Sequence, residues 1–282
     1  MPVRIVQSKQ NARLKELRRA LAVPTRQSPR HARTLAGVEG PNLIAEALRS
    51  GLRVHCVFAA QGFENLLEPL ALPPKTEILL MPRELLSSAL STETPQPVAA
   101  LVESPDWTWA HLLDSHRKVV PLLAVLAAIQ DPGNLGAILR SAEAFGADGV
   151  LALPGTVSAW NPKAVRASAG SVFRLPMLAV GVEDCFTHLR EAGVRIWTTT
   201  VHAAEPADLV DLSAPVALIF GNEGSGVPAN IAAHADGAVT IPCPGAVESL
   251  NAAVAASILL YEAARQRGSS SGRILDLRGG ER

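Results

Sequence analysis

Polar side chains that could do chemistry lie in three short stretches after residue 129 of the 282-residue chain. "QDPGNLGAILRS" holds Asn134 and Arg140, "FGNEGSGV" holds Glu223, and "PCPGAVESLNAAVA" holds Ser249 and Asn251. Arginine suits an anionic ligand, and a carboxylate suits a cationic or hydroxylated one. The glycine-rich stretch has no lysine to meet a triphosphate and fits neither G-x-G-x-x-G nor a phosphate loop. The three stretches therefore indicate a ligand site of another kind.

Each of these residues also has a purely structural interpretation. Asn134 and Ser249 stand where a polar side chain could cap a helix. Arg140 lies in an apolar helical pattern, where a buried ion pair is the alternative to a functional role. Gly221, Gly224 and Gly226 could serve a ligand or simply provide positive φ. The residues alone leave both interpretations open.

The elements that must position these stretches alternate between apolar strands and helices. Strands are expected at 119–129, 149–154, 195–200, 216–221 and 237–242, and helices at 135–145, 162–168, 183–192, 228–234 and 249–267. Strands of nearly continuous apolar character separated by helices predict a mostly parallel sheet covered on both faces. Ligands bind such sheets where the strands end. The last helix is apolar on nearly every face, which predicts burial in a core or a subunit interface.

The first part of the chain predicts a smaller α/β domain. Strands are expected at 53–60, 77–81 and 97–103. A first helix is expected to be capped by Ser8 and to run through Arg19, and others are expected from Pro41 to Ser50 and from Pro82. Residues 104–118 contain two of the four tryptophans and no strong strand signal, so they are predicted to be a linker. The expected organisation is a domain at 1–103, the linker, a domain at 119–267 and a flexible tail at 268–282.

Charge is distributed unevenly along a chain whose net charge is zero. Residues 1–53 contain 11 Lys and Arg against 3 Asp and Glu. Such a basic segment is typical either of a nucleic-acid contact or of a solvated basic helix. If nucleic acid binds there, the candidate phosphate contacts are Arg13, Lys15, Arg18 and Arg19.

The cysteines and the apolar runs indicate a reduced, cytoplasmic setting. Cys56, Cys185 and Cys243 are far apart and show neither metal-ligand spacing nor a disulfide framework. The first ten residues have no apolar signal-peptide core. The longest apolar run, about a dozen residues, is too short to span a membrane.

Taken in order, the three polar stretches resemble the SpoU/TrmH branch of the SPOUT methyltransferases. The resemblance is carried by "DPGNLGAILRSAEAFGADGV", "LIFGNEGSGV" and "IPCPGAVESLNAAVAASILLYEAARQR". The first part is similar to that family's substrate-binding domain, which is like ribosomal protein L30e, through "SKQNARLK", "GVEGPNLIAEAL" and "STETPQPVAALV". The resemblance implies an α/β fold with a deep trefoil knot, usually in a homodimer with the last helix in the interface.

The resemblance also implies an activity and a set of site residues. The family transfers a methyl group from S-adenosylmethionine to an RNA ribose 2′-hydroxyl. Thr199, Gly221, Ile241 and Leu250 match positions that hold this cofactor, and Asn134, Arg140, Glu223, Ser249 and Asn251 match polar positions of the active site. Arg140 matches the family's proposed proton acceptor, but guanidinium groups stay protonated in proteins, so we expect an electrostatic role.

Departures from the family pattern leave every reactive side chain in place. Cys243 stands where Met is common, Ala252 and Ala253 replace Val and Ser, and Pro97 replaces Gly.

The L30e-like part favours ribosomal RNA, most of all 23S RNA, as the substrate. A transfer RNA methyltransferase, a non-catalytic RNA- or ribosome-binding protein and a dinucleotide-dependent oxidoreductase are the alternatives. The absence of G-x-G-x-x-G after the first strand of the second domain argues against the last of these.

Overall fold

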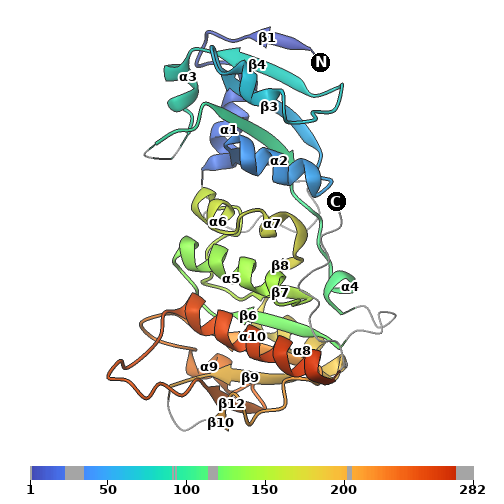
Figure 1. The fold of residues 1–282 in the computed structure, drawn as a ribbon, viewed down its shortest axis with the longest axis vertical. Helices are drawn as coiled ribbons and strands as arrows, with labels where there is room; N and C mark the ends of the chain where they lie inside the picture. The colour runs from blue at the N-terminus through green and yellow to red at the C-terminus, as the bar shows by residue number, and fades with distance from the viewer. Residues whose placement is uncertain are drawn as a thin grey trace. The chain divides into compact units, whose positions relative to one another are not determined.

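The computed structural model describes residues 2–22, 35–90, 92, 94–113, 120–201 and 205–270 (Figure 1). The chain forms two compact units, which are considered one at a time. Unit 1 comprises Met1–Asp106 and Ser158–Arg174, and unit 2 comprises Trp107–Val157 and Leu175–Arg282. Residues 158–174, which the sequence analysis placed in the second domain, thus group with unit 1 by their contacts.

Unit 1 contains a mixed five-stranded sheet. Its strands are β1 (Val3–Ile5), β2 (Leu35–Glu39), β3 (Val54–Ala60), β4 (Glu77–Met81) and β5 (Val98–Glu103), in the order β1-β4-β3-β5-β2. β4 pairs in parallel with β1 and β3, whereas β5 pairs antiparallel with β3 and β2. The three predicted strands are confirmed. β1 and β2 were missed because one is only three residues long and the other, "LAGVE", contains a glycine and a glutamate.

Six short helices belong to unit 1: α1 (Ala12–Leu21), α2 (Pro41–Arg49), η1 (Glu64–Leu67), α3 (Arg83–Ser87), α6 (Pro162–Ala167) and α7 (Ser171–Arg174). α2 begins at Pro41 as predicted, but the prediction that Ser8 caps the first helix is wrong. The Asn11 side chain accepts hydrogen bonds from the backbone N–H groups of Arg13 and Leu14, so α1 starts at Ala12. Buried leucines on α1 then pack against the sheet in one apolar cluster.

Unit 2 is built on a seven-stranded sheet in which every pairing is parallel. The strands are β6 (Leu122–Leu126), β7 (Gly149–Ala152), β8 (Met177–Ala179), β9 (Arg195–Thr199), β10 (Glu205–Pro206), β11 (Val216–Phe220) and β12 (Gly237–Thr240), in the order β10-β12-β9-β11-β6-β7-β8. This confirms the predicted parallel sheet and all five predicted strands. β8 and β10 were missed because they are short and partly exposed.

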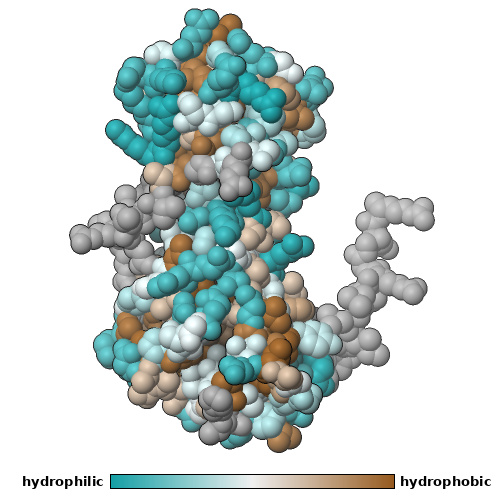
Figure 2. All heavy atoms as spheres, turned by 90° about the vertical axis from the view of Figure 1, so that its left-hand side faces the viewer, coloured by the Kyte–Doolittle hydropathy of each residue, from teal (hydrophilic) through white to brown (hydrophobic). Residues whose placement is uncertain are grey.

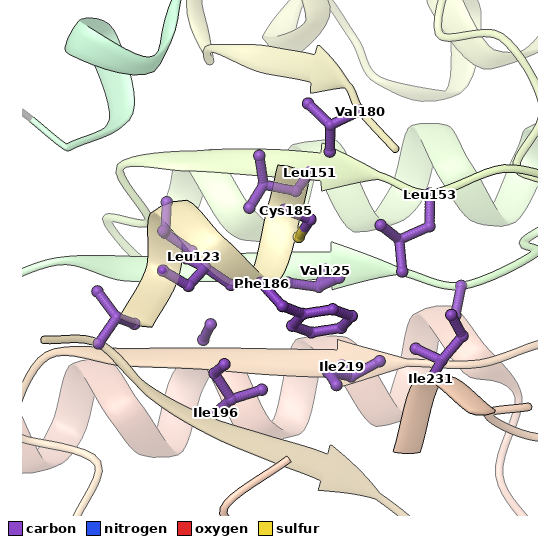
Figure 3. Packing of buried hydrophobic residues seen from close by; sticks show 14 of the residues in the cluster. Leu123, Val125, Leu151, Leu153, Val180, Cys185, Phe186, Ile196, Ile219 and Ile231 are labelled. Carbon is purple, nitrogen blue, oxygen red and sulfur yellow. The ribbon is translucent and has the colours of Figure 1, made fainter. Parts of the chain in front are cut away.

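Helices cover both faces of this sheet, as predicted. They are α4 (Trp109–Leu112), α5 (Pro132–Ala144), α8 (Val182–Glu191), α9 (Ala229–Ala232) and α10 (Ala252–Ser270). Phe186 of α8 and Ile231 of α9 pack against Val125 and other residues of one face, while α5 and α10 lie behind the strands (Figure 3). α5 and α10 contact each other through the hydroxyls of Ser141 and Ser257, which lie 2.7 Å apart. The knot implied by the family resemblance stays a prediction.

Two of the three cysteines are buried in the units' cores. Burial raises the pKa of the Cys56 and Cys185 thiols to about 12, which makes them poor nucleophiles, whereas Cys243 is exposed.

Hydrophobic side chains also reach the surface of unit 2, where brown patches appear at the bottom of Figure 2. The exposed ones include Val201, Leu209, Val247, Val254, Ile258 and Tyr261. In the part of the chain that the structure describes, no helix is long and apolar enough to cross a membrane.

Candidate active site at the ends of the parallel strands

The pairing of β6 with β11 brings two of the three polar stretches together. The strands run in parallel with Leu126 opposite Phe220, and these are the last residues of each strand. Because their carboxyl ends meet at one edge, the loops that lead to Asn134 and to Glu223 start side by side.

Asn134 joins the three stretches through its side chain. The carboxylate of Asp131 accepts a hydrogen bond of 2.9 Å from the backbone N–H of Asn134, so Asp131 caps α5. The predicted cap at Asn134 is therefore wrong, and its amide is free for other partners. This amide donates to Glu223 Oε1, and its oxygen accepts a 3.1 Å hydrogen bond from Asn251 Nδ2. Three of the five polar residues that the family resemblance grouped, Glu223, Asn134 and Asn251, thus form one hydrogen-bonded chain.

Asn251 has a second role at the start of α10. Its Oδ1 accepts hydrogen bonds from the backbone N–H groups of Ala253 and Val254, at 2.9 and 3.2 Å. Asn251, and not Ser249, therefore caps this helix, which starts at Ala252 and so three residues later than predicted. The same side chain fixes the helix end and contacts Asn134, while Ser249 lies exposed in the preceding loop.

The glycines of the second stretch are required by the loop's own fold. Asn222 and Gly226 exchange two backbone hydrogen bonds, of 3.1 and 2.8 Å. A Cβ on Gly221 would lie less than 3.0 Å from the backbone of Gly226 and Val227, and Gly226 itself has a φ of +67°. Both glycines therefore allow the tight loop that presents Glu223.

A cavity of about 970 Å³ opens beside this loop. The four residues predicted to hold the cofactor all line it: Thr199, Gly221, Ile241 and Leu250. Glu223 and Ser249 line it as well. Other lining residues were not among the predicted site residues. They stand at the ends of β9 and β12 and beyond, and include Thr198, Thr240, Cys243 and Glu248. Thr198 and Thr240 carried a signal, since both stand at the carboxyl end of a predicted strand.

Arg140 stands apart from this network. It lies on α5, is exposed, and makes no hydrogen bond or ion pair with the described residues. The alternative of a buried structural ion pair is therefore wrong. Glu223 binds Asn134 and does not anchor Arg140. The guanidinium is left available to a ligand from solution.

The four basic candidates in unit 1 fall into two pairs. Arg13 contacts Glu16 at 2.8 Å and Glu77 at 3.4 Å, and the hydrogen bond to Glu16 raises the pKa of its guanidinium. Arg18 donates to the Ser88 hydroxyl at 3.1 Å. Lys15 and Arg19 are exposed and have no partner among the described residues.

Unit 1 also contains a second cavity, of about 980 Å³. Its lining is mostly basic and includes Arg4, Arg13, Arg53, His55 and Lys75 together with Glu77.

Family comparisons decide what kind of site the larger unit carries. Residues 121–261 match the SpoU rRNA Methylase family, and residues 38–108 match the family described as RNA 2′-O ribose methyltransferase substrate binding. The chain belongs to the SpoU methyltransferase family. The predicted family and enzyme class, an RNA 2′-O-ribose methyltransferase, are thereby confirmed.

Individual SpoU proteins resemble this chain over most of its length. The 23S rRNA (guanosine(2553)-2′-O)-methyltransferase RlmP of Bacillus subtilis is 34% identical, over 79% of this chain and 86% of that protein. The AdoMet complex of the SpoU methyltransferase AviRb from Streptomyces viridochromogenes is 30% identical, with a TM-score of 0.78, and the match covers 92% of this chain and 99% of AviRb. An AdoMet-bound rRNA methyltransferase from Sinorhizobium meliloti is 30% identical, with a TM-score of 0.78 and coverage of 93% and 98%.

These neighbours also bear on the fold and on the cofactor. The predicted α/β class with a smaller first domain is confirmed. The prediction of S-adenosylmethionine as cofactor is confirmed at the level of the SpoU family. Among the residues that the structure describes, no group of three or more His, Cys, Asp or Glu could hold a metal ion.

Proposed function

We propose that this SpoU protein methylates a ribose 2′-hydroxyl of 23S ribosomal RNA in the cytoplasm, using S-adenosylmethionine. One observation carries the proposal. The hydrogen-bonded chain Glu223–Asn134–Asn251 joins three distant stretches, and two of these also line the cavity of about 970 Å³. Such a convergence of polar groups beside a cavity at the strand ends is the arrangement expected of a ligand site.

The residues of the cavity fit S-adenosylmethionine. A volume of about 970 Å³ lies at the upper end of the range for small-molecule sites, and leaves room for a nucleoside with an amino-acid arm. Apolar side chains that include Phe220, Val239 and Leu259 suit a flat base, while the backbone at Gly221, Ile241 and Leu250 offers hydrogen bonds. When bound, S-adenosylmethionine supplies a methyl group already activated on a sulfonium.

The chain's own residues must position the ribose and handle the charge that develops on its oxygen. Positioning alone is worth roughly 7–11 kcal/mol in the best intramolecular models. Asn134, which is held between Glu223 and Asn251, orients the ribose. Arg140 holds the neighbouring phosphate and stabilises the developing alkoxide, because its guanidinium has no competing partner in the described structure. Ser249, exposed at the cavity wall, binds the nucleotide.

The names of relatives support 23S RNA over transfer RNA as the substrate. RlmP of B. subtilis acts on 23S rRNA according to its name, and the S. meliloti neighbour is named an rRNA methyltransferase. A 34% identical protein of Mycolicibacterium vanbaalenii is named only a tRNA/rRNA methyltransferase. Transfer RNA is therefore the second candidate.

Methylation assays on defined RNAs would test the target. We expect the protein to transfer labelled methyl groups to 23S RNA lacking native modification and not to transfer RNA. Mapping of 2′-O-methyl groups in cells with and without the protein should show one site lost from 23S RNA. Methylation confined to transfer RNA would contradict the rRNA proposal. Binding of RNA without transfer to any RNA would favour the non-catalytic alternative.

RNA contact by α1 should show in the salt dependence of binding. Lys15→Gln with Arg19→Gln removes two exposed cations that have no partner in the described structure. Each cation that meets a phosphate steepens the slope of log K against log salt by about 1. We expect weaker binding and a slope reduced by about 1–2, measured by fluorescence anisotropy with a labelled 23S fragment. Arg49→Gln with Arg83→Gln removes the same charge from unit 1 outside α1, and should leave the slope unchanged.

The last helix is proposed to pair two copies of the chain. Val254, Ile258 and Tyr261 are exposed on α10 at helical spacing, so they form one apolar stripe. Ile258→Glu would place a charge in that stripe, and we expect a monomer by light scattering where the natural chain is a dimer. Leu209→Glu, which changes another exposed apolar residue of unit 2, should leave the dimer intact. A natural chain that is monomeric at micromolar concentration would contradict the proposal.

A further inference from the structure

A buried hydroxyl in the wall of the cavity of about 970 Å³ has no hydrogen-bond partner among the described residues. Thr198, on β9, is 9% exposed and lines the cavity. Its Oγ1 makes no hydrogen bond with the described residues. A buried hydroxyl without a hydrogen bond is costly, so native structures seldom leave one unless a ligand or a water satisfies it.

The hydroxyl of the neighbouring threonine, Thr199, already has a hydrogen-bond partner. Thr199 Oγ1 donates a 2.8 Å hydrogen bond to the carbonyl oxygen of Ile219, so its donor is already used within the sheet. Successive residues of a strand point to opposite faces, and Thr198 therefore shares its face with Ile196. The sequence resemblance singled out Thr199, but the structure leaves the free hydroxyl on Thr198.

The surroundings of Thr198 are apolar. Its register neighbours on the adjoining strands are Ile219 and Ala238. Ile196 and Ile219 belong to the apolar cluster that α8 and α9 cover, and Val227 packs against that cluster. Val227 and Ala232 line the cavity together with Thr198. A wall of this kind accepts a flat heterocycle and offers one polar contact to it.

We infer that the Thr198 hydroxyl hydrogen-bonds to the adenosine half of the cofactor and contributes to selectivity for that nucleoside. The inference rests on the proposed cofactor site. Adenosine is favoured over the amino-acid arm because a charged ammonium and carboxylate would lose water against an apolar wall without a compensating charge. The hydroxyl can both donate and accept, which suits the amino group and the ring nitrogens of adenine.

The test is a calorimetric titration of the full chain with S-adenosylhomocysteine, the product that remains after methyl transfer. Thr198→Val keeps the shape of the side chain and removes only the hydroxyl. We expect its Kd to rise about 10-fold, equivalent to about 1.4 kcal/mol. Thr198→Ser, which restores the hydroxyl, should bind within about threefold of the natural chain. Equal affinity of Thr198→Val and the natural chain would overturn the inference.

Binding of a fragment of the ligand shows which part of the ligand the Thr198 hydroxyl contacts. 5′-Methylthioadenosine lacks the amino-acid arm, and Thr198→Val should weaken its binding by the same factor. If binding of the fragment is unchanged while that of S-adenosylhomocysteine falls, the hydroxyl meets the arm and the adenosine assignment is wrong. Failure of the natural chain to bind S-adenosylhomocysteine at all would instead contradict the proposed function.

A matched variant in unit 1 controls for the loss of any buried hydroxyl. Thr76 is 1% exposed, and its Oγ1 likewise has no partner among the described residues. It lines the second cavity, in unit 1, and not the cavity of about 970 Å³ that Thr198 lines. Thr76→Val should therefore leave the Kd unchanged. Thermal unfolding without ligand should show Thr198→Val at least as stable as the natural chain, and a lower Tm with weak binding would indicate a structural role and overturn the inference.

Discussion

Arg140→Ala should reduce methyl transfer by about 10²–10³-fold in kcat, the usual effect of removing one electrostatic contact to a developing oxyanion. The affinity for S-adenosylhomocysteine should stay near that of the natural chain, because Arg140 does not line the cavity. Arg140 is also exposed and has no partner among the described residues, so its truncation should leave Tm almost unchanged. Single-turnover methylation, calorimetry and thermal unfolding of the same variant measure the three quantities.

Arg140→Lys is the informative companion to this variant. It keeps the charge but loses the planar fork that binds a phosphate through two N–H groups. We expect transfer intermediate between the alanine variant and the natural chain. If Arg140→Ala instead loses cofactor affinity, the role of Arg140 in holding the RNA phosphate and the alkoxide is wrong.

Gly221→Ala should abolish cofactor binding and destabilise unit 2. The added methyl group would lie less than 3.0 Å from the backbone of Gly226 and Val227. Backbone atoms cannot move away as a flexible side chain would, so the Asn222–Gly226 pairing must open. Overpacking of this kind typically costs about 1–3 kcal/mol, which corresponds to a fall in Tm of about 2–12 °C for a unit of this size. Thermal unfolding with and without S-adenosylhomocysteine measures both effects.

Gly224→Ala in the same loop is the matched control. A Cβ there would meet only the Asn222 side chain, at 3.5 Å, which is an ordinary contact. Gly224 also has no positive φ, so alanine should be tolerated with Tm and ligand affinity near those of the natural chain. If Gly221→Ala and Gly224→Ala have the same Tm and the same affinity for S-adenosylhomocysteine, crowding at Gly221 does not shape the site.

The roles of the polar residues show where prediction from the sequence ended. The sequence marked Asn134 as either a cap or a site residue. Asp131, three residues earlier, caps α5, so the Asn134 side chain bonds with Glu223 and Asn251 instead. The same ambiguity at Ser249 was resolved by the helix start at Ala252, which makes Asn251 the cap. Cap and site roles use the same residue types, so only the backbone geometry separates them.

The sequence by itself determined the family and the kind of sheet, because apolar strands, helices and the three polar stretches are local patterns. The tertiary structure decided which of those patterns meet. Asn134 lies 89 residues from Glu223 and 117 from Asn251, and only the parallel register of β6 with β11 and the position of α10 bring them within hydrogen-bond reach. The exposure of the Arg140 guanidinium and the lack of a partner for the Thr198 hydroxyl among the described residues were likewise decided there, since burial and hydrogen bonding depend on neighbours that are distant in the chain.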